Sequence, residues 1–283
     1  MPKFRCRDIT SKQKQDIVSV ATTLAGVPAI LRIPATVTRP PIVLWHGFGP
    51  PASERALLEA LPLDEIAAVK VYVGLPLFGD RAPEGGMREV ARRQAEDLAS
   101  EIYEPVILGA AHELERILEA LTHHTCLGAH EQVGLFGFSA GGAAVLSALM
   151  KQTPSVTAAI TLNASTGLHA SITAYERATH HQYTWTPRAR QLAKETDAVA
   201  RASDIAGKSP RPPALLILHG NDDTMLPPKT VQELYHALRP FYQRENTGRL
   251  QLSLLSGVAH AWTTPETLHK LRKQIAEWYQ RFL

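Results

Sequence analysis

The chain has 283 residues, of which 45% are hydrophobic and 20% charged, a balance that is ordinary for a globular protein with a substantial core. Its formal charge of +3 is small and its basic residues are scattered, which argues against a nucleic-acid partner. The polar N-terminus lacks the apolar core of a signal peptide and no apolar run reaches membrane-spanning length, so we expect a cytoplasmic protein with no membrane partner.

Strand and helix patterns alternate through the first half of the chain. The expected elements are a hairpin with strands at 16–22 and 27–33, a strand at 42–45, a helix at 53–61, a strand at 67–73, a long helix from 91 to 121, a strand at 132–138, a helix at 140–151 and a strand at 158–163. The long helix is amphipathic, with apolar positions at steps of three or four. Pro105 should kink or split it near 101–104, because proline lacks the N–H that a helix interior requires.

Residues 165–211 break this rhythm. They contain a helix-like run at 187–200 but no strand pattern, so we interpret them as a helical lid over the strand ends. An ordinary crossover helix with long loops is the alternative. The pattern then resumes with a strand at 214–218, a helix at 229–239, a strand at 250–255 and a last helix capped by Thr264 and Pro265.

This alternation predicts an α/β fold. We expect a mostly parallel sheet of about eight strands with helices on both faces, formed by one domain over residues 1–283, with the lid insertion at 165–211 inside it. Ligands of such sheets bind beyond the carboxyl ends of the strands. Residues that follow strands are therefore the first candidates for a site.

The pentapeptide Gly137-Phe138-Ser139-Ala140-Gly141 follows one predicted strand and matches the Gly-x-Ser-x-Gly nucleophile elbow. A serine on this sharp turn has a strained backbone, so the residues two positions away must be small. The turn exposes the hydroxyl at a helix N-terminus, where free N–H groups and the helix dipole favour negative charge.

Two further strand ends carry residues that would activate Ser139. Asp223 follows the strand at 214–218, and His260 follows the strand at 250–255. Imidazole suits a general base because its ordinary pKa of about 6.5 lies near working pH, and a carboxylate fixes its tautomer. Asp222 is the alternative acid. His46 and His219 precede glycines in strand-end turns and are expected to make structural hydrogen bonds.

The order serine, acid, histidine is that of the α/β-hydrolases. From about residue 42 onward, the chain resembles the dienelactone-hydrolase and prolyl-oligopeptidase-like esterases of that superfamily. Residues 219–227 are similar to the family's His-Gly-x-x-Asp-x-x-Val-Pro turn, which implies Asp223 as the acid, and Gly257-Val258-Ala259-His260 matches the loop of the family's histidine. Dienelactone hydrolases use a cysteine nucleophile, so Ser139 favours a serine esterase over that lactonase.

The oxyanion hole should consist of two backbone N–H groups. One belongs to Ala140, directly after the nucleophile. By resemblance to His-Gly-x loops, the other belongs to Phe48, between Gly47 and Gly49. Phe78 and Trp185 are candidates for the substrate pocket, with a purely packing role as the alternative.

We therefore predict a serine carboxylesterase that acts through an acyl-enzyme on a small-molecule ester. Ser139 would attack, His260 would be the general base and then the acid, and Asp223 would orient it. No metal or other cofactor is expected, and the protein would be a monomer or a homodimer. A serine peptidase, a thioesterase or acyltransferase, and a catalytically silent binding module remain alternatives; about forty residues before the strand at 42–45 leave little room for a peptidase's accessory domain.

Overall fold

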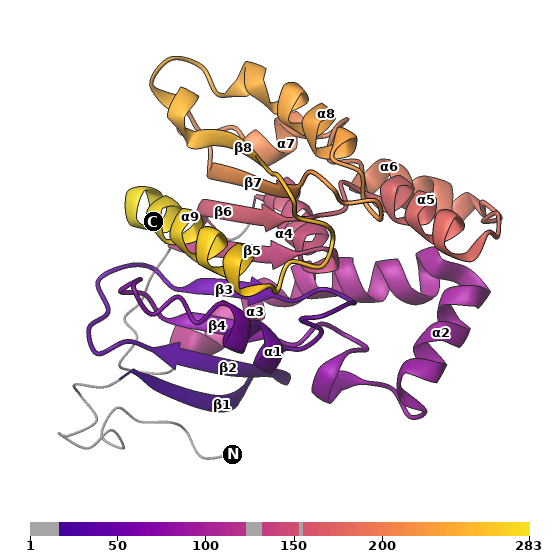
Figure 1. The fold of residues 1–283 in the computed structure, drawn as a ribbon, viewed down its shortest axis with the longest axis horizontal. Coiled ribbons are helices and arrows are strands. Elements are labelled where there is room, and N and C mark those ends of the chain that lie inside the picture. The colour runs from indigo at the N-terminus through magenta and orange to yellow at the C-terminus, as the bar shows by residue number, and fades with distance from the viewer. Residues whose placement is uncertain (1–16, 123–131, 153–154) are drawn as a thin grey trace.

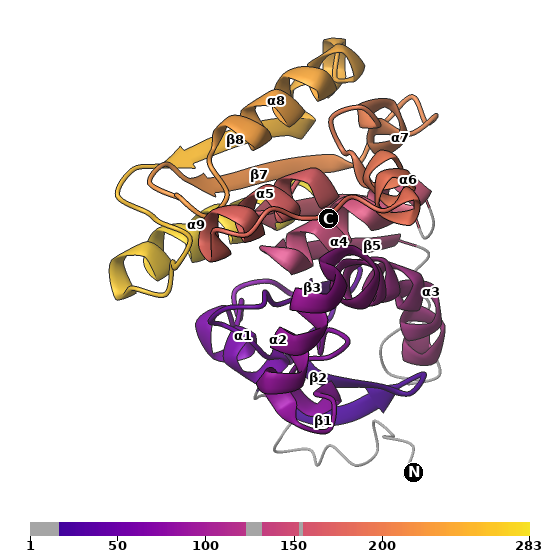
Figure 2. The same cartoon turned by 90° about the vertical axis from the view of Figure 1, so that its right-hand side faces the viewer.

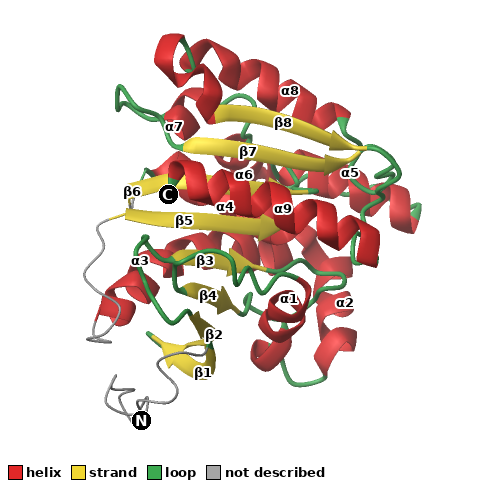
Figure 3. Cartoon of the chain, turned by 60° about the vertical axis from the view of Figure 1, so that its left-hand side comes forward, coloured by secondary structure: helices red, strands yellow, loops and turns green. Residues whose placement is uncertain are grey.

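The computed structural model describes residues 17–122, 132–152 and 155–283 (Figure 1). These residues form a central sheet with helices on both faces (Figure 3). The predicted α/β class and the estimate of about eight strands are both confirmed, because the described residues contain an eight-stranded sheet of order β1-β2-β4-β3-β5-β6-β7-β8.

The sheet is parallel apart from its opening hairpin. Its strands are β1 (Val18–Leu24), β2 (Val27–Ile33), β3 (Ile42–Trp45), β4 (Lys70–Val73), β5 (Gln132–Phe138), β6 (Ser155–Leu162), β7 (Ala214–Gly220) and β8 (Leu250–Leu255). The hairpin β1–β2 is antiparallel and β2 joins β4 antiparallel, whereas all other neighbours run parallel. The carboxyl ends of β3, β5, β6, β7 and β8 therefore lie at one edge.

The helices divide between the two faces of the sheet. They are α1 (Glu54–Ala60), α2 (Gly86–Asp97), the π-helix η4 (Leu98–Leu108), α3 (Gly109–Thr122), α4 (Ala140–Lys151), α5 (Leu168–Thr179), α6 (Pro187–Thr196), α7 (Ala202–Ala206), α8 (Lys229–Leu238) and α9 (Pro265–Phe282), with short 3₁₀ turns η3 (Gly79–Arg81), η5 (Arg239–Phe241) and η6 (Arg244–Arg249). Helices α1 and α9 cover one face, and α3, α4, α7 and α8 cover the other (Figure 3). Each face buries its own apolar cluster, which fixes the sheet between two helical layers.

The long helix expected from 91 to 121 is divided, and the position predicted for its break was wrong. Helix α2 ends at Asp97, which has extended backbone angles (φ −158°, ψ 99°) and caps η4. The Asp97 carboxylate accepts the backbone N–H groups of Ala99 at 2.9 Å and Ser100 at 3.3 Å. Pro105 lies inside the π-helix η4, so the chain breaks at the capping aspartate rather than near 101–104.

The segment 165–211 contains no strand, as predicted, but it contains three helices where the sequence indicated one helix-like run at 187–200. Figures 1 and 2 show α5 and α6 beyond the carboxyl ends of the parallel strands, on the side that faces the viewer in Figure 2. Helix α7 instead packs on α4 against the face of the sheet. The segment thus combines two helices at the edge where ligands bind with one helix of an ordinary crossover.

Smaller differences concern element ends. Strand β4 begins at Lys70 rather than at 67, β6 begins at Ser155 rather than at 158, and the helix expected at 187–200 ends at Thr196. Among the residues that the structure describes, no helix combines the length and the apolar character needed to cross a lipid bilayer.

Candidate active site

Ser139 sits on a strained turn between β5 and α4. Its backbone angles, φ 53° and ψ −114°, are costly for a residue with a side chain, of the order of 1–3 kcal/mol. A Cβ on Gly137 would lie 2.1 Å from the carbonyl oxygen of Gly141, and a Cβ on Gly141 would lie 2.5 Å from the carbonyl oxygens of Trp45 and His46. The two glycines of the elbow are thus required because backbone passes directly over them.

The structure brings Ser139, His260 and Asp223 together in one chain of hydrogen bonds. The Nε2 atom of His260 lies 3.1 Å from the Ser139 hydroxyl, and its Nδ1 atom lies 2.8 Å from Oδ2 of Asp223. An Nδ1–H donated to the carboxylate leaves Nε2 as an acceptor for the serine proton. This is the arrangement that a serine nucleophile needs for its activation.

Asp223 is held in place by its own turn. Its Oδ1 accepts the backbone N–H groups of Met225 and Leu226, both at 2.9 Å, and its side chain is fully buried. Those bonds leave Oδ2 for His260. Asp222, the alternative acid, is exposed and makes no hydrogen bond to His260. The carboxylate that faces the imidazole is therefore that of Asp223.

His46 and His219 make structural hydrogen bonds, as predicted. Nε2 of His46 accepts the N–H of Leu75 at 3.1 Å, so the proton lies on Nδ1, which donates to the carbonyl of Gly47 at 2.7 Å. Burial lowers the pKa of His46 to about 4. Nε2 of His219 donates to the carbonyl of Leu226 at 2.7 Å, and burial lowers its pKa as well.

The loop that contains Gly47 packs directly on the nucleophile. A Cβ on Gly47 would lie 3.0 Å from Cβ of Ser139 and 2.8 Å from the Phe138 ring. Ala140 is the first residue of α4, where backbone N–H groups lack helical acceptors. Within the described residues, neither its N–H nor that of Phe48 donates a hydrogen bond. Both predicted oxyanion donors thus belong to segments adjoining Ser139, and both are unused.

The two residues expected in the substrate pocket lie in different surroundings. Phe78 is only 3% exposed and stacks on Phe48, with ring centroids 4.7 Å apart. Trp185 is half-buried between α5 and α6 and contacts the rings of His169 and Tyr183. Phe78 accordingly supports the loop that bears Phe48, whereas Trp185 retains accessible surface.

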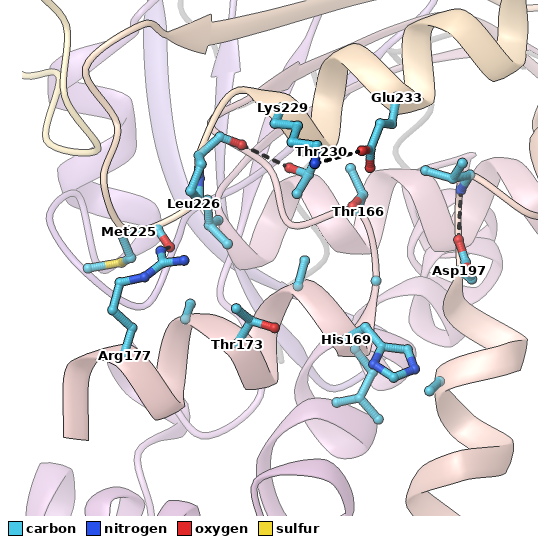
Figure 4. Close-up of a pocket in the computed structure, with 17 residues that line it drawn as sticks. Thr166, His169, Thr173, Arg177, Asp197, Met225, Leu226, Lys229, Thr230 and Glu233 are labelled. Carbon is cyan, nitrogen blue, oxygen red and sulfur yellow. Dashed lines mark hydrogen bonds and ion pairs between the residues drawn. The ribbon is translucent and has the colours of Figure 1, made fainter. Parts of the chain in front are cut away.

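A cavity of about 470 Å³ lies next to the turn that bears the acid, between α5 and α8 (Figure 4). Arg177 of α5 points to this turn and donates to the carbonyls of Thr224 at 2.8 Å and Met225 at 3.3 Å. Ser139, Asp223 and His260 do not line this cavity. It borders the site without containing the three residues.

One polar residue of the site was not identified from the sequence. Asn163 follows β6, is fully buried, and bonds both to Gly220 at the end of β7 and to the loop of His260. Its place directly after a central strand was the available signal.

Over the described ranges, no group of three or more His, Cys, Asp or Glu side chains is arranged to hold a metal ion. The two cysteines of the chain, Cys6 and Cys126, lie outside the described residues.

Comparison with known proteins gives one family match and many structural neighbours. The sequence profile described as the prolyl oligopeptidase family matches residues 110–283, more than half of the chain. No curated protein matches the chain.

Three solved structures illustrate the likeness. TT1662 of Thermus thermophilus is 22% identical with a TM-score of 0.69, covering 94% of this chain and 99% of that one. A puromycin-hydrolyzing peptidase of Mycobacterium tuberculosis is 18% identical with a TM-score of 0.66, covering 94% and 39% of the two chains. The Pyrococcus furiosus esterase Pf2001 is 13% identical with a TM-score of 0.60, covering 96% of each. At these identities the likeness shows a shared fold.

Proposed function

The chain belongs to the prolyl oligopeptidase family and is a serine hydrolase of the α/β-hydrolase fold, and within that class we propose that it is a carboxylesterase that acts through an acyl-enzyme on Ser139. The observation that carries the proposal is the hydrogen-bonded chain Ser139–His260–Asp223, at 3.1 Å and 2.8 Å. The family membership supports a serine hydrolase, and this chain of bonds supplies the nucleophile, the base and the acid that an acyl-enzyme mechanism requires.

In the acylation step, His260 takes the proton from Ser139 as Oγ attacks the ester carbonyl. The N–H groups of Ala140 and Phe48 stabilise the oxyanion of the tetrahedral intermediate. The imidazolium, stabilised by Asp223, then donates its proton to the leaving alkoxide as the C–O bond breaks. In deacylation, His260 removes a proton from water as the water attacks the acyl-enzyme carbonyl. The imidazolium then returns this proton to Oγ of Ser139 as the acyl C–O bond breaks, which releases the carboxylic acid and regenerates the serine and the neutral histidine.

An ester is favoured over a peptide on chemical grounds. An alkoxide is a better leaving group than an amine, so a base and two oxyanion donors suffice for ester cleavage without an extended peptide-binding surface. The likeness to the Pyrococcus furiosus esterase over 96% of both chains accords with this choice. We infer that helices α5 and α6, which lie beyond the carboxyl ends of the parallel strands, bound the acyl site, with Trp185 as a candidate contact for the substrate.

The test is hydrolysis of p-nitrophenyl esters from acetate to palmitate by the parent protein and by the variant Ser139→Ala. The parent should cleave at least the short esters, and the variant should lose about 10⁴-fold or more in kcat because the nucleophile is absent. Its fold should persist, since the substitution removes only one hydroxyl, which caps no helix N–H. Full turnover by Ser139→Ala would refute the assignment.

A peptidase is the second candidate, favoured by the family match and by the peptidase among the structural neighbours. The same three residues would cleave an amide with His260 protonating the leaving amine. A chromogenic dipeptide measured beside the short esters separates the two: a higher kcat/KM for the dipeptide would replace the esterase proposal.

A further inference from the structure

Asn163 lies where three strand ends meet. It follows β6, and its backbone N–H donates to the carbonyl of Leu218 in β7 at 3.0 Å. Its side-chain Oδ1 accepts the N–H of Gly220 at 2.7 Å. Its Nδ2 donates to the carbonyls of Ala259 at 3.0 Å and His260 at 3.1 Å. The carboxamide thus connects the strand that precedes the acid with the loop that bears the histidine.

The chemistry of this position admits few residue types. One side of the Asn163 carboxamide faces a donor and the other faces two acceptors, so a single orientation of its O and N atoms satisfies all three bonds. The backbone is left-handed, with φ 46°, a conformation that asparagine tolerates better than most residues. The side chain is fully buried, so no solvent replaces a lost bond.

A backbone hydrogen bond also holds the histidine loop next to these contacts. The carbonyl of Val258 accepts the N–H of Asp222 at 3.0 Å. The next two carbonyls, those of Ala259 and His260, accept hydrogen bonds from Asn163 and from no other described residue. Among the described residues, Asn163 thus supplies the side-chain hydrogen bonds to the backbone that carries the imidazole, whose Nε2 lies 3.1 Å from the Ser139 hydroxyl.

We propose that Asn163 is a positioning residue for the reaction: its amide fixes the backbone of residues 259 and 260 so that the His260 imidazole meets both Ser139 and Asp223. This inference rests on the proposed function. Asn163 touches no reacting atom and acts through His260. Displacement of a catalytic group by about 1 Å can cost about 100-fold in rate, so a loss of this anchor is visible in kcat.

The test compares two variants of Asn163 and one control variant with the parent. For each protein, kcat and KM are measured on p-nitrophenyl acetate, and the active enzyme is counted by fluorophosphonate titration. Asn163→Asp keeps the acceptor for Gly220 but places a carboxylate oxygen against two carbonyls. Asn163→Gly removes the side chain and tolerates the left-handed backbone. Both should lower kcat by about 10- to 100-fold while KM changes little. The glycine variant keeps the proposal testable if the aspartate variant does not fold.

The matched control is Asn246→Asp. Asn246 is also buried, at 8% exposure, and its Nδ2 donates to the carbonyl of Pro210 at 2.9 Å in a contact that includes none of the three active-site residues. This variant should unfold at a lower temperature with parental kcat. If Asn163→Asp or Asn163→Gly also keeps kcat within about twofold of the parent while only its melting temperature falls, the positioning role is refuted.

Failure of this inference and failure of the proposed function give different results. If Ser139→Ala retains parental turnover, the proposed function is wrong whatever the Asn163 variants show. If Ser139→Ala is inactive and the Asn163 variants keep parental kcat, only the positioning role is wrong.

Discussion

Acid should destabilise this protein through His46, which is buried and held neutral. Its Nε2 accepts the N–H of Leu75, so a proton at Nε2 would remove the acceptor and place a charge in the core. The pKa is lowered from 6.5 to about 4 in the folded chain. The unfolded chain therefore binds a proton that the folded chain does not bind between pH 6.5 and pH 4, and stability is lost as pH falls through that window.

The size of the effect follows from these two pKa values. At pH 7 the folded state is neutral at His46 and the unfolded state is only about one-quarter protonated, so the loss of stability is small, about 0.2 kcal/mol. At pH 5 the unfolded state is mostly protonated and the folded state is not, which lowers the free energy of unfolding by about 2 kcal/mol. Below pH 4 the loss from this residue reaches its limit, about 3 kcal/mol.

The measurement is urea unfolding at pH 7, 6 and 5, followed by tryptophan fluorescence, for the parent and for His46→Gln. Glutamine does not titrate, so the variant should lose about 2 kcal/mol less than the parent between pH 7 and pH 5. His219 also has a lowered pKa, but it is present in both proteins and cancels from the difference. Parallel pH dependences in the two proteins would refute the reasoning.

Two pairs of substitutions test the turns that follow the strands. Gly137→Ala places a Cβ 2.1 Å from a backbone oxygen and should lower the free energy of unfolding by about 3 kcal/mol or more, whereas Gly49→Ala, whose Cβ meets no atom within 4 Å, should be close to neutral in urea unfolding. Asp223→Asn should lower kcat on p-nitrophenyl acetate by about 10⁴-fold through the wrong histidine tautomer, and Asp222→Asn should leave kcat nearly unchanged. Equal effects at the two aspartates would contradict the assignment of the acid.

The central strands were predictable because they are short, fully buried apolar runs, as in β3 and β7. The range 132–138 and the helix at 140–151 were predicted with the bounds that the structure has, since the elbow and the small residues around it mark the boundary sharply. The order of serine, acid and histidine at successive strand ends likewise gave candidates that the structure brings within hydrogen-bond distance.

What escaped prediction depends on contacts between distant segments. The break at Asp97 comes from a carboxylate that caps the next helix. The apolar residues on both sides of Asp97 continue at steps of three or four, so the sequence pattern does not mark the break. The burial of Phe78 results from stacking on Phe48, thirty residues earlier in the chain. From the sequence, Asn163 is predicted only as the last residue of a strand. Its hydrogen bonds go to two carbonyls that are 96 and 97 positions away in the chain, and no local pattern indicates them.

The most direct measurement is the reaction of the protein with a fluorophosphonate, followed by mass spectrometry of its peptides and by assay of the remaining ester hydrolysis. We expect one phosphonyl group per chain, on Ser139, with turnover lost in proportion to labelling and no label on Ser139→Ala. Ester hydrolysis that continues undiminished with Ser139 unlabelled, or a label on a different serine that abolishes it, would contradict the account.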